Sequence, residues 1–177
     1  MNEGEINPTS PADVSPAETA QIAPDRRFFG SYAHSLDSKG RMILPNVYRI
    51  PLGKKFTVGP TMDYQGIALY PDEVFEQILS RISSPNQFQP AIQKALAQLA
   101  KLSYREMQTD TQGRLLLPAK LRQRMLGEAK ELEISGALTH IRVMSSDKAD
   151  ADDAYFTEHL EEILNQVGNL TDTTQPN

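Results

Sequence analysis

The chain uses one ten-residue pattern twice, and this repeat limits the folds that the sequence allows. Residues 36–45 and residues 109–118 each begin with one variable residue and then read Asp-x-x-Gly-Arg, three apolar residues and Pro. The same offset carries Arg49 onto Arg122. A fixed internal repeat indicates that one structural unit occurs more than once. We therefore expect two copies of a small module, at residues 28–76 and 104–148.

The pattern itself predicts a turn, then a short strand, then a helix. Asp37 and Asp110 can accept hydrogen bonds from the backbone amides that follow them, and Gly40 and Gly113 can adopt a positive φ without steric cost. The apolar triplet after Gly-Arg is too short for a helix and indicates a buried strand. The proline ends that strand and suits the first turn of a helix. We interpret these four aspartate and glycine residues as residues that shape the turns.

Further strands and one short helix complete each copy. Strands are expected at residues 29–35, 55–58, 67–70, 104–108, 131–134 and 140–144. Short helices are expected at residues 46–50 and 119–126, with Gly53 and Gly127 as their C-caps. A unit this small buries too little apolar area to be secure alone, so the two copies are expected to pack on each other.

Two amphipathic helices are predicted to link the modules across residues 77–103. One begins near Asp72 and is broken at residues 83–86, and the other spans residues 90–102. Their apolar stripes are read first as intramolecular core and, alternatively, as a subunit interface. Residues 1–27 are rich in Pro, Ser, Thr, Ala and Glu and are predicted to be a disordered acidic tail. Residues 149–177 are predicted to form an acidic helix and tail, with the helix docked on the body.

Charge is distributed unevenly along the chain. The net charge is −5, yet residues 28–145 hold fifteen basic and ten acidic side chains. Residues 146–177 hold one lysine and eight acidic side chains. A basic folded part is the electrostatic pattern expected of a nucleic-acid-binding protein. The acidic tails either compete with nucleic acid for the basic surface or only aid solubility.

Several functional classes find no support in the sequence. The chain has no cysteine, and its three histidines are isolated, so no metal site is expected. No apolar run approaches the roughly 20 residues of a membrane span, and the N-terminus does not resemble a secretory signal. No catalytic triad, phosphate-binding loop or nucleotide fingerprint is present, so we expect no enzymatic activity, cofactor or small-molecule substrate. A cytoplasmic, nucleoid-associated protein is the expectation.

The repeated pattern, following a short strand, is similar to the AbrB/SpoVT swapped-hairpin DNA-binding module. Two tandem copies, led by residues 29–32 and 36–41, resemble the MraZ family of bacterial transcriptional regulators over residues 28–145. The resemblance implies a mainly β fold with short helices (α+β), in which two swapped-hairpin modules form a double-ψ-like barrel bridged by a helix pair. Two departures from the family are the longer tail before Phe28 and the absence of a tryptophan after the last strand.

The resemblance also implies a function. Members of that family bind direct repeats in the promoter of their own division and cell-wall operon as a ring-shaped homo-oligomer, so a ring of octamer-like size is expected. The alternative is an AbrB-type antitoxin or another non-enzymatic interaction protein. An antitoxin of that type usually carries one module and a tail that folds on a toxin, whereas this chain carries two modules.

The candidate DNA-binding residues are the cations of the two turns and of the helices that follow them. They are Arg41, Lys39, Arg114, Arg49, Lys120 and Arg122. Arginine can bond guanine through two parallel hydrogen bonds, and a two-stranded ribbon can enter the major groove. The lysines are expected on phosphates. The competing interpretation of each turn arginine is an ion pair with the aspartate four positions earlier; we expect Arg41 instead to face outward, with no turn to hold.

Overall fold

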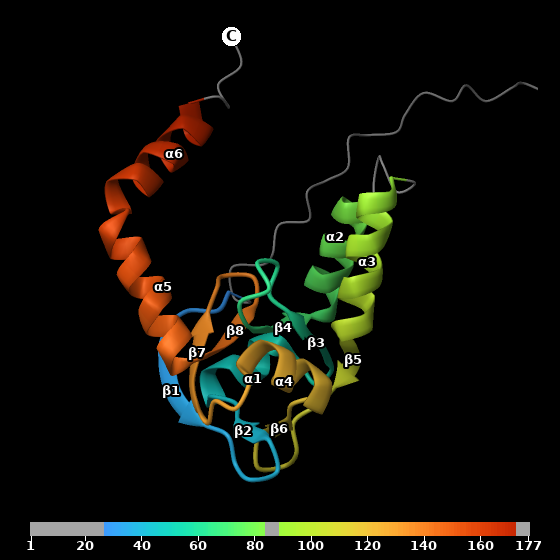
Figure 1. Ribbon diagram of the computed structural model, residues 1–177. Coiled ribbons are helices and arrows are strands. Elements are labelled where there is room, and N and C mark those ends of the chain that lie inside the picture. Colours follow the sequence, from blue (N-terminus) through green and yellow to red (C-terminus); the bar gives the residue numbers. More distant parts are fainter. Residues whose placement is uncertain (1–26, 84–88, 173–177) are drawn as a thin grey trace, which may run out of the picture.

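The computed structural model describes residues 27–83 and 89–172 of the chain, as a mixed α+β fold built mainly on antiparallel sheet (Figure 1). The acidic tail predicted over residues 1–27 lies outside the described residues, apart from Arg27. The strands are β1 (Ser31–Ser35), β2 (Arg41–Ile43), β3 (Phe56–Pro60), β4 (Ile67–Pro71), β5 (Tyr104–Met107), β6 (Arg114–Leu116), β7 (Glu131–Gly136) and β8 (Ile141–Ser145). The helices are α1 (Asn46–Leu52), α2 (Asp72–Ser83), α3 (Pro90–Leu102), α4 (Ala119–Leu126), α5 (Ser146–Glu158) and α6 (Leu160–Asp172).

The two sequence repeats become two copies of one element order, and they exchange strands. The first repeat supplies β1, β2, α1, β3 and β4, and the second supplies β5, β6, α4, β7 and β8. The main sheet has the order β1-β7-β8-β4-β3-β5, so the first strand of each repeat pairs with the third strand of the other. The β4–β8 pair lies at the centre of this sheet, and the strand order is symmetric about it. Neither repeat therefore forms its part of the sheet alone.

The strands β2 and β6 form a separate two-stranded antiparallel ribbon. Their register pairs Arg41 with Leu116, Met42 with Leu115, and Ile43 with Arg114. Because these strands pair with each other, the main sheet stays open, with β1 and β5 at its edges. The closed double-ψ-like barrel that the sequence predicted is therefore not present among the described residues.

A single apolar core joins both repeats. It includes residues from equivalent places in the two copies, such as Met42 and Leu115 of the ribbon and Leu52 and Leu126 of the helices. Tyr48 of α1 is buried, and its hydroxyl donates a 2.6 Å hydrogen bond to the carbonyl of Gly30. Burial of its ring and hydroxyl raises the pKa of Tyr48 to about 12. This bond ties the helix of the first repeat to the segment that leads into β1.

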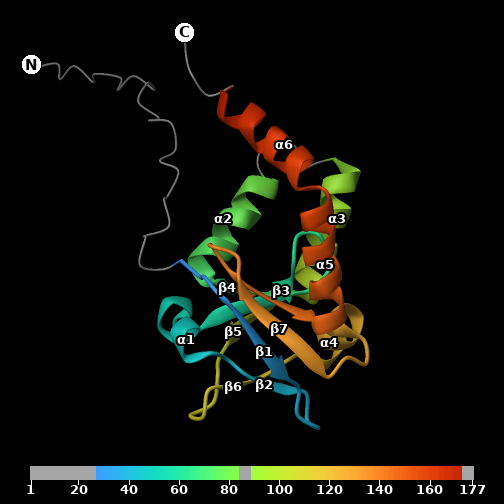
Figure 2. The same cartoon turned by 90° about the vertical axis from the view of Figure 1, so that its left-hand side faces the viewer.

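The predicted helices are confirmed. Both α1 and α4 follow the prolines of the repeat, and both end at the glycines expected as C-caps, Gly53 and Gly127. The helices α2 and α3 lie side by side and project from one end of the sheet (Figures 1 and 2). Their inner faces form part of a second apolar cluster, which includes Phe75 of α2, Leu99 of α3 and Tyr70 of β4. In the described residues these stripes are thus at least partly intramolecular core, the first of the two interpretations.

The C-terminal helices do not dock on the body as the sequence led us to expect. The first turns of α5 contact β7 and β8, where Ala149 is buried. Beyond them, α5 and α6 extend away from the sheet (Figures 1 and 2). An apolar periodicity predicts that a helix face is suited to burial, but it does not identify the surface that covers the face. Within residues 27–83 and 89–172, no helix combines the length and the apolar character that crossing a bilayer requires.

Candidate nucleic-acid interface

The two Asp-x-x-Gly-Arg turns have the same geometry. One carboxylate oxygen of Asp37, Oδ1, accepts hydrogen bonds from the backbone amides of Lys39 and Arg41, both at 2.9 Å. The amide of Gly40 donates to the carbonyl of Asp37, also at 2.9 Å. The second turn repeats these bonds around Asp110, with amides supplied by residues 112, 113 and 114. Each aspartate therefore fixes the path of the backbone from the turn into the ribbon.

The arginine of each turn is held by the aspartate of the same turn. Nε of Arg41 donates to Oδ2 of Asp37 at 2.7 Å, and Nε of Arg114 donates to Oδ2 of Asp110 at the same distance. The expectation that Arg41 has no turn to hold is therefore wrong, because a carboxylate that already bonds turn amides lies within reach of its guanidinium. Both side chains remain partly exposed, at 28% for Arg41 and 32% for Arg114. The ion pair occupies Nε, and no further hydrogen bond from either guanidinium is found among the described residues.

The same hydrogen bonds perturb the titration of both aspartates. The backbone amide of Arg41 is the largest influence that lowers the pKa of Asp37, and the arginine side chain lowers it further. The backbone amide of Arg114 and then its side chain lower the pKa of Asp110 in the same way. Both carboxylates are thus stabilised in their charged form by the turns they shape.

An acid-sensitive contribution to stability follows from these lowered pKa values. The contribution is complete above the unfolded-state pKa of aspartate, at about pH 4, and is lost as the pH falls through the lower folded-state pKa. We expect the double variant Asp37→Asn, Asp110→Asn to be less stable than the parent chain at pH 7, and to differ less from it at pH 3. Urea unfolding at both pH values and one protein concentration measures this. An equal loss of stability at both pH values would contradict the assignment.

The arginines of the two helices cross to the opposite turns. The guanidinium of Arg122, on α4, lies against Gly40, and that of Arg49, on α1, lies against Gly113. A Cβ atom on either glycine would overlap the guanidinium that covers it. Both glycines also have a φ of +76°, which L side chains rarely adopt. Each turn thus needs glycine for two reasons, its backbone conformation and the arginine of the other repeat.

Backbone hydrogen bonds reinforce this exchange between repeats. The amide of Leu44 donates to the carbonyl of Gly113 at 2.9 Å, and the amide of Leu117 donates to the carbonyl of Gly40 at 3.2 Å. Nε of Arg49 also donates to the carbonyl of Leu44 at 2.9 Å. Arg49 and Arg122 are both among the DNA contacts predicted from the sequence. Their position across the opposite turns was not foreseen, because a repeat shows which residues are equivalent but not which repeat each one contacts.

The ribbon presents a mixed apolar and basic outer face. The middle residues of its strands, Met42 and Leu115, are buried, whereas Ile43 and Leu116 are 49% and 54% exposed. The prediction of a wholly buried triplet is therefore wrong, because successive side chains of a strand point to opposite faces. The register places four side chains together on the outer face, which we call the ribbon face: Arg41, Ile43, Arg114 and Leu116.

Both predicted lysines are exposed. Lys39 lies within the first turn, and its equivalent in the second turn is Gln112. Lys120 lies on α4, two residues after the proline that ends the second copy of the pattern. Both turns lie at the end of the molecule opposite to α2, α3 and α6 (Figures 1 and 2). The structure thus gathers the turn arginines and Lys39 at one end of the molecule.

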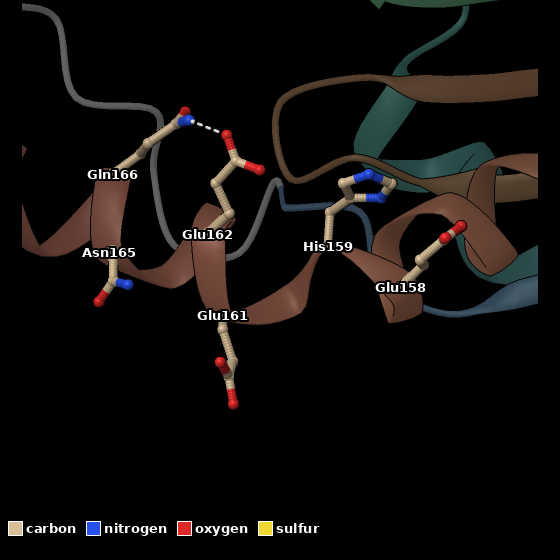
Figure 3. A pocket seen from close by; sticks show the side chains of 6 residues that line it. All are labelled: Glu158, His159, Glu161, Glu162, Asn165 and Gln166. Carbon is tan, nitrogen blue, oxygen red and sulfur yellow. Dashed lines mark hydrogen bonds between the residues drawn. The ribbon is translucent and has the colours of Figure 1, made fainter.

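A shallow hollow at the junction of α5 and α6 is a weaker candidate site. Figure 3 shows its lining side chains, among them Glu161 and Glu162, which point to different sides of the helix. Glu162 accepts a 3.4 Å hydrogen bond from Gln166 of the next turn. In the described part of the chain, no three His, Cys, Asp or Glu side chains lie close enough together to hold a metal ion. We therefore assign no ligand to this hollow.

Known proteins that resemble this chain in sequence come from the same family that the repeated turn motif indicated. A family model described as "MraZ protein, putative antitoxin-like" matches residues 28–97. A transcriptional regulator MraZ of Desulforamulus reducens is 29% identical over 143 residues, which are 81% of this chain and 99% of the relative. The protein of the same name from Carboxydothermus hydrogenoformans is 33% identical over 121 residues, 68% of this chain and 82% of the relative. That from Mycobacterium ulcerans is 34% identical over 116 residues, 66% of this chain and 79% of the relative. On this similarity, the chain belongs to the MraZ family.

Proposed function

We propose that this chain is a sequence-specific DNA-binding transcriptional regulator that presents its β2–β6 ribbon to DNA. The observation that carries the proposal is the pair of equivalent turns, each of which holds a partly exposed arginine on the same ribbon face. The ribbon is narrow enough for the major groove. The relatives are named as transcriptional regulators, which agrees with this role.

The residues take different parts in this proposal. Arg41 and Arg114 read base edges, because their Nη groups remain available after Nε has bonded the aspartate. Lys39 and Lys120 contact phosphates. Arg49 and Arg122, which lie across the opposite turns, add positive charge beside the ribbon and remain predicted contacts.

The proposal extends to an assembly. Residues 28–76 and 104–148 are the two modules, residues 77–103 link them, and residues 1–27 and 149–177 flank them. One ribbon offers few base contacts, so we propose that identical chains form a ring and bind direct repeats in the promoter of their own division and cell-wall operon. Several weak contacts joined in one assembly gain avidity. Such a protein acts in the cytoplasm, on the nucleoid.

The assembly is tested by its mass in solution. We expect multi-angle light scattering at micromolar protein concentration to give a mass several times the 19.7 kDa of one chain. The physical reason is that many large apolar side chains outside the ribbon face are exposed on the single chain, including Phe29, Ile50 and Leu164. A monodisperse species of one-chain mass at all concentrations would contradict the ring.

DNA binding is expected to depend strongly on salt in spite of the net negative charge. Contacts between cations and phosphates release counterions, so the logarithm of the affinity should fall with the logarithm of the salt concentration, with a slope of about −0.9 per phosphate contact. Fluorescence anisotropy with duplex from the chain's own upstream region, from low to physiological salt, measures the slope. Footprinting on the same DNA tests for protected direct repeats. Equal affinity at all salt concentrations, or no protection, would contradict the proposal.

The alternative function is that of an antitoxin or another interaction protein. The observation that favours it is the acidic pair of helices α5 and α6, whose apolar side chains are exposed. The same footprint separates the two functions, because an antitoxin that acts only through protein contacts gives no protected repeats.

A further inference from the structure

The C-terminal helices expose an apolar stripe that nothing in the described chain covers. Along α5 and α6 the exposed side chains of this stripe are Tyr155, Phe156, Leu160, Leu164 and Val167. Leu164, at the middle of α6, is 57% exposed. Both helices extend away from the sheet (Figures 1 and 2). Five exposed large apolar side chains within thirteen residues, on two consecutive helices, indicate a binding surface. We call residues 155–167 the arm.

Acidic side chains flank the apolar stripe of the arm. Glu158, Glu161 and Glu162 are exposed at the junction of the two helices, and Figure 3 shows them on different sides of it. Residues 146–177 as a whole hold eight acidic side chains and one lysine. The arm therefore suits a surface that is both apolar and basic.

The ribbon face has that composition. Ile43 and Leu116 are about half exposed on it, and Arg41 and Arg114 lie beside them. Lys39 adds a further positive charge at the first turn. The apolar side chains of the arm match Ile43 and Leu116, and its carboxylates match the arginines and the lysine. Opposite charges around an apolar centre favour one partner and one orientation over others.

The arm and the ribbon of one chain are too far apart to meet. In both views the two turns lie at one end of the molecule and α6 lies at the other (Figures 1 and 2). A contact between them therefore requires a second copy of the chain. Pairing of one arm with another arm is disfavoured, because both carry the same strong negative charge.

We propose that the arm of one copy docks on the ribbon face of a second copy and competes there with DNA. The competition rests on the function proposed above, whereas the docking does not. The carboxylates of the arm pair with the arginines that otherwise read base edges and with the lysine that otherwise contacts phosphate, and its apolar side chains cover Ile43 and Leu116. DNA binding is then self-limited by the concentration of the protein, and an assembled state raises the local concentration of arms further.

Docking is tested by cysteine crosslinking, for which a chain without cysteine is well suited. Full-length Leu164→Cys and full-length Leu116→Cys, carrying different tags, are mixed under mild oxidation. We expect a disulfide between the two variants. Two matched controls use Ala97→Cys, exposed on α3, in place of the ribbon variant, and Asn165→Cys in place of the arm variant. Both control mixtures should crosslink at least about tenfold less, since a disulfide needs Cα atoms within about 7 Å and Cβ atoms that point toward each other. Position 97 fails the first condition and position 165 the second.

The result that overturns docking is equally specific. Crosslinks only between two Leu164→Cys chains would mean that the arms pair with each other. Equal crosslinking of the Ala97→Cys control would mean random collision. Either outcome would falsify the proposal whether or not the protein binds DNA, so failure of docking and failure of the proposed function are distinguishable.

Competition is tested by adding duplex DNA to the crosslinking mixture and by removing the apolar stripe. Duplex should suppress the disulfide between positions 164 and 116. The double variant Leu160→Ser, Leu164→Ser should lower the apparent Kd for DNA about fivefold if arms occupy about four-fifths of the ribbon faces. Asn165→Ser is the control and should leave the Kd unchanged. A crosslink that DNA does not suppress, or an unchanged Kd in the double variant, would overturn the competition.

Discussion

Replacement of Gly40 by alanine is expected to destabilise the protein by about 2 kcal/mol, through left-handed backbone strain and overpacking together. Gly40 has a φ of +76°, and an added Cβ would overlap the guanidinium of Arg122. Arg122 can rotate away only by leaving the turn that it covers. The equivalent change, Gly113→Ala, should cost a similar amount, because Arg49 lies over that glycine in the same way.

Gly127 shows what a positive φ costs without any side-chain overlap. It has a φ of +59° and a ψ of −128°, and a Cβ there would meet nothing within 4 Å. This ψ lies outside the left-handed α region, so Gly127→Ala should show backbone strain alone, at about 1–3 kcal/mol. Urea unfolding measures all three variants at one fixed protein concentration, which keeps any contribution from association the same in each. If Gly40→Ala costs no more than the roughly 1 kcal/mol of left-handed strain, the crossed arginine contributes nothing at this glycine.

A double-mutant cycle separates the two causes at Gly40. In the background of Arg122→Ala the overlap is gone, so Gly40→Ala should then cost only the strain of its positive φ, about 1 kcal/mol. The difference between the two backgrounds is the coupling between turn and arginine. No coupling would mean that the glycine is required for its backbone conformation alone.

The local structure was predictable because the signals for it are local. Proline after the apolar triplet, glycine after the helix and an aspartate before Gly-Arg each act on residues within one turn of the chain. The helices α1 and α4 and their C-caps Gly53 and Gly127 follow directly from these signals. Because the pattern occurs twice, each of these signals predicted a pair of equivalent elements.

The arrangement of the repeats was not predictable from the same signals. Whether β1 pairs within its own repeat or with β7 depends on contacts between distant residues, and the sequence of each repeat suits both choices. The exposure of Ile43 and Leu116 could not be predicted either. All three residues of the triplet are apolar, so the sequence shows no alternation that would identify the side chain facing solvent. The charge of the turn residues identified the candidate interface, but the pairing of β2 with β6 placed both arginines on one face.

Arg41→Ala is expected to lower the affinity for specific DNA by at least about tenfold, because one good bidentate contact to a base pair is worth about 1–3 kcal/mol of discrimination. The melting temperature should change little, since the ion pair between Arg41 and Asp37 is partly exposed to solvent. Arg41→Lys should restore little affinity, because an ammonium group lacks the planar pair of donors. Gel-shift titration and a thermal melt are needed on each variant.

Arg81→Ala is the matched control for the loss of charge. Arg81 is exposed on α2, which projects from the end of the molecule away from the ribbon (Figure 1). Arg81→Ala removes the same kind of side chain and the same charge as Arg41→Ala. It should nevertheless reduce DNA affinity only slightly, through long-range electrostatics. If both variants lose affinity equally, Arg41 acts through net charge and not through a contact.

The two turns should not contribute equally to DNA affinity. Exchanging the residues at positions 39 and 112 tests the cause of this difference. The turns share the same hydrogen bonds, but the first carries Lys39 where the second carries Gln112. Arg114→Ala is therefore expected to lose less affinity than Arg41→Ala. Gln112→Lys should raise affinity and steepen the salt slope by about 0.9, and Lys39→Gln should do the reverse, since one phosphate contact is gained or lost. If Gln112→Lys changes neither affinity nor slope while Lys39→Gln weakens both, the second turn does not reach DNA, and Arg114 serves only the turn that Asp110 shapes.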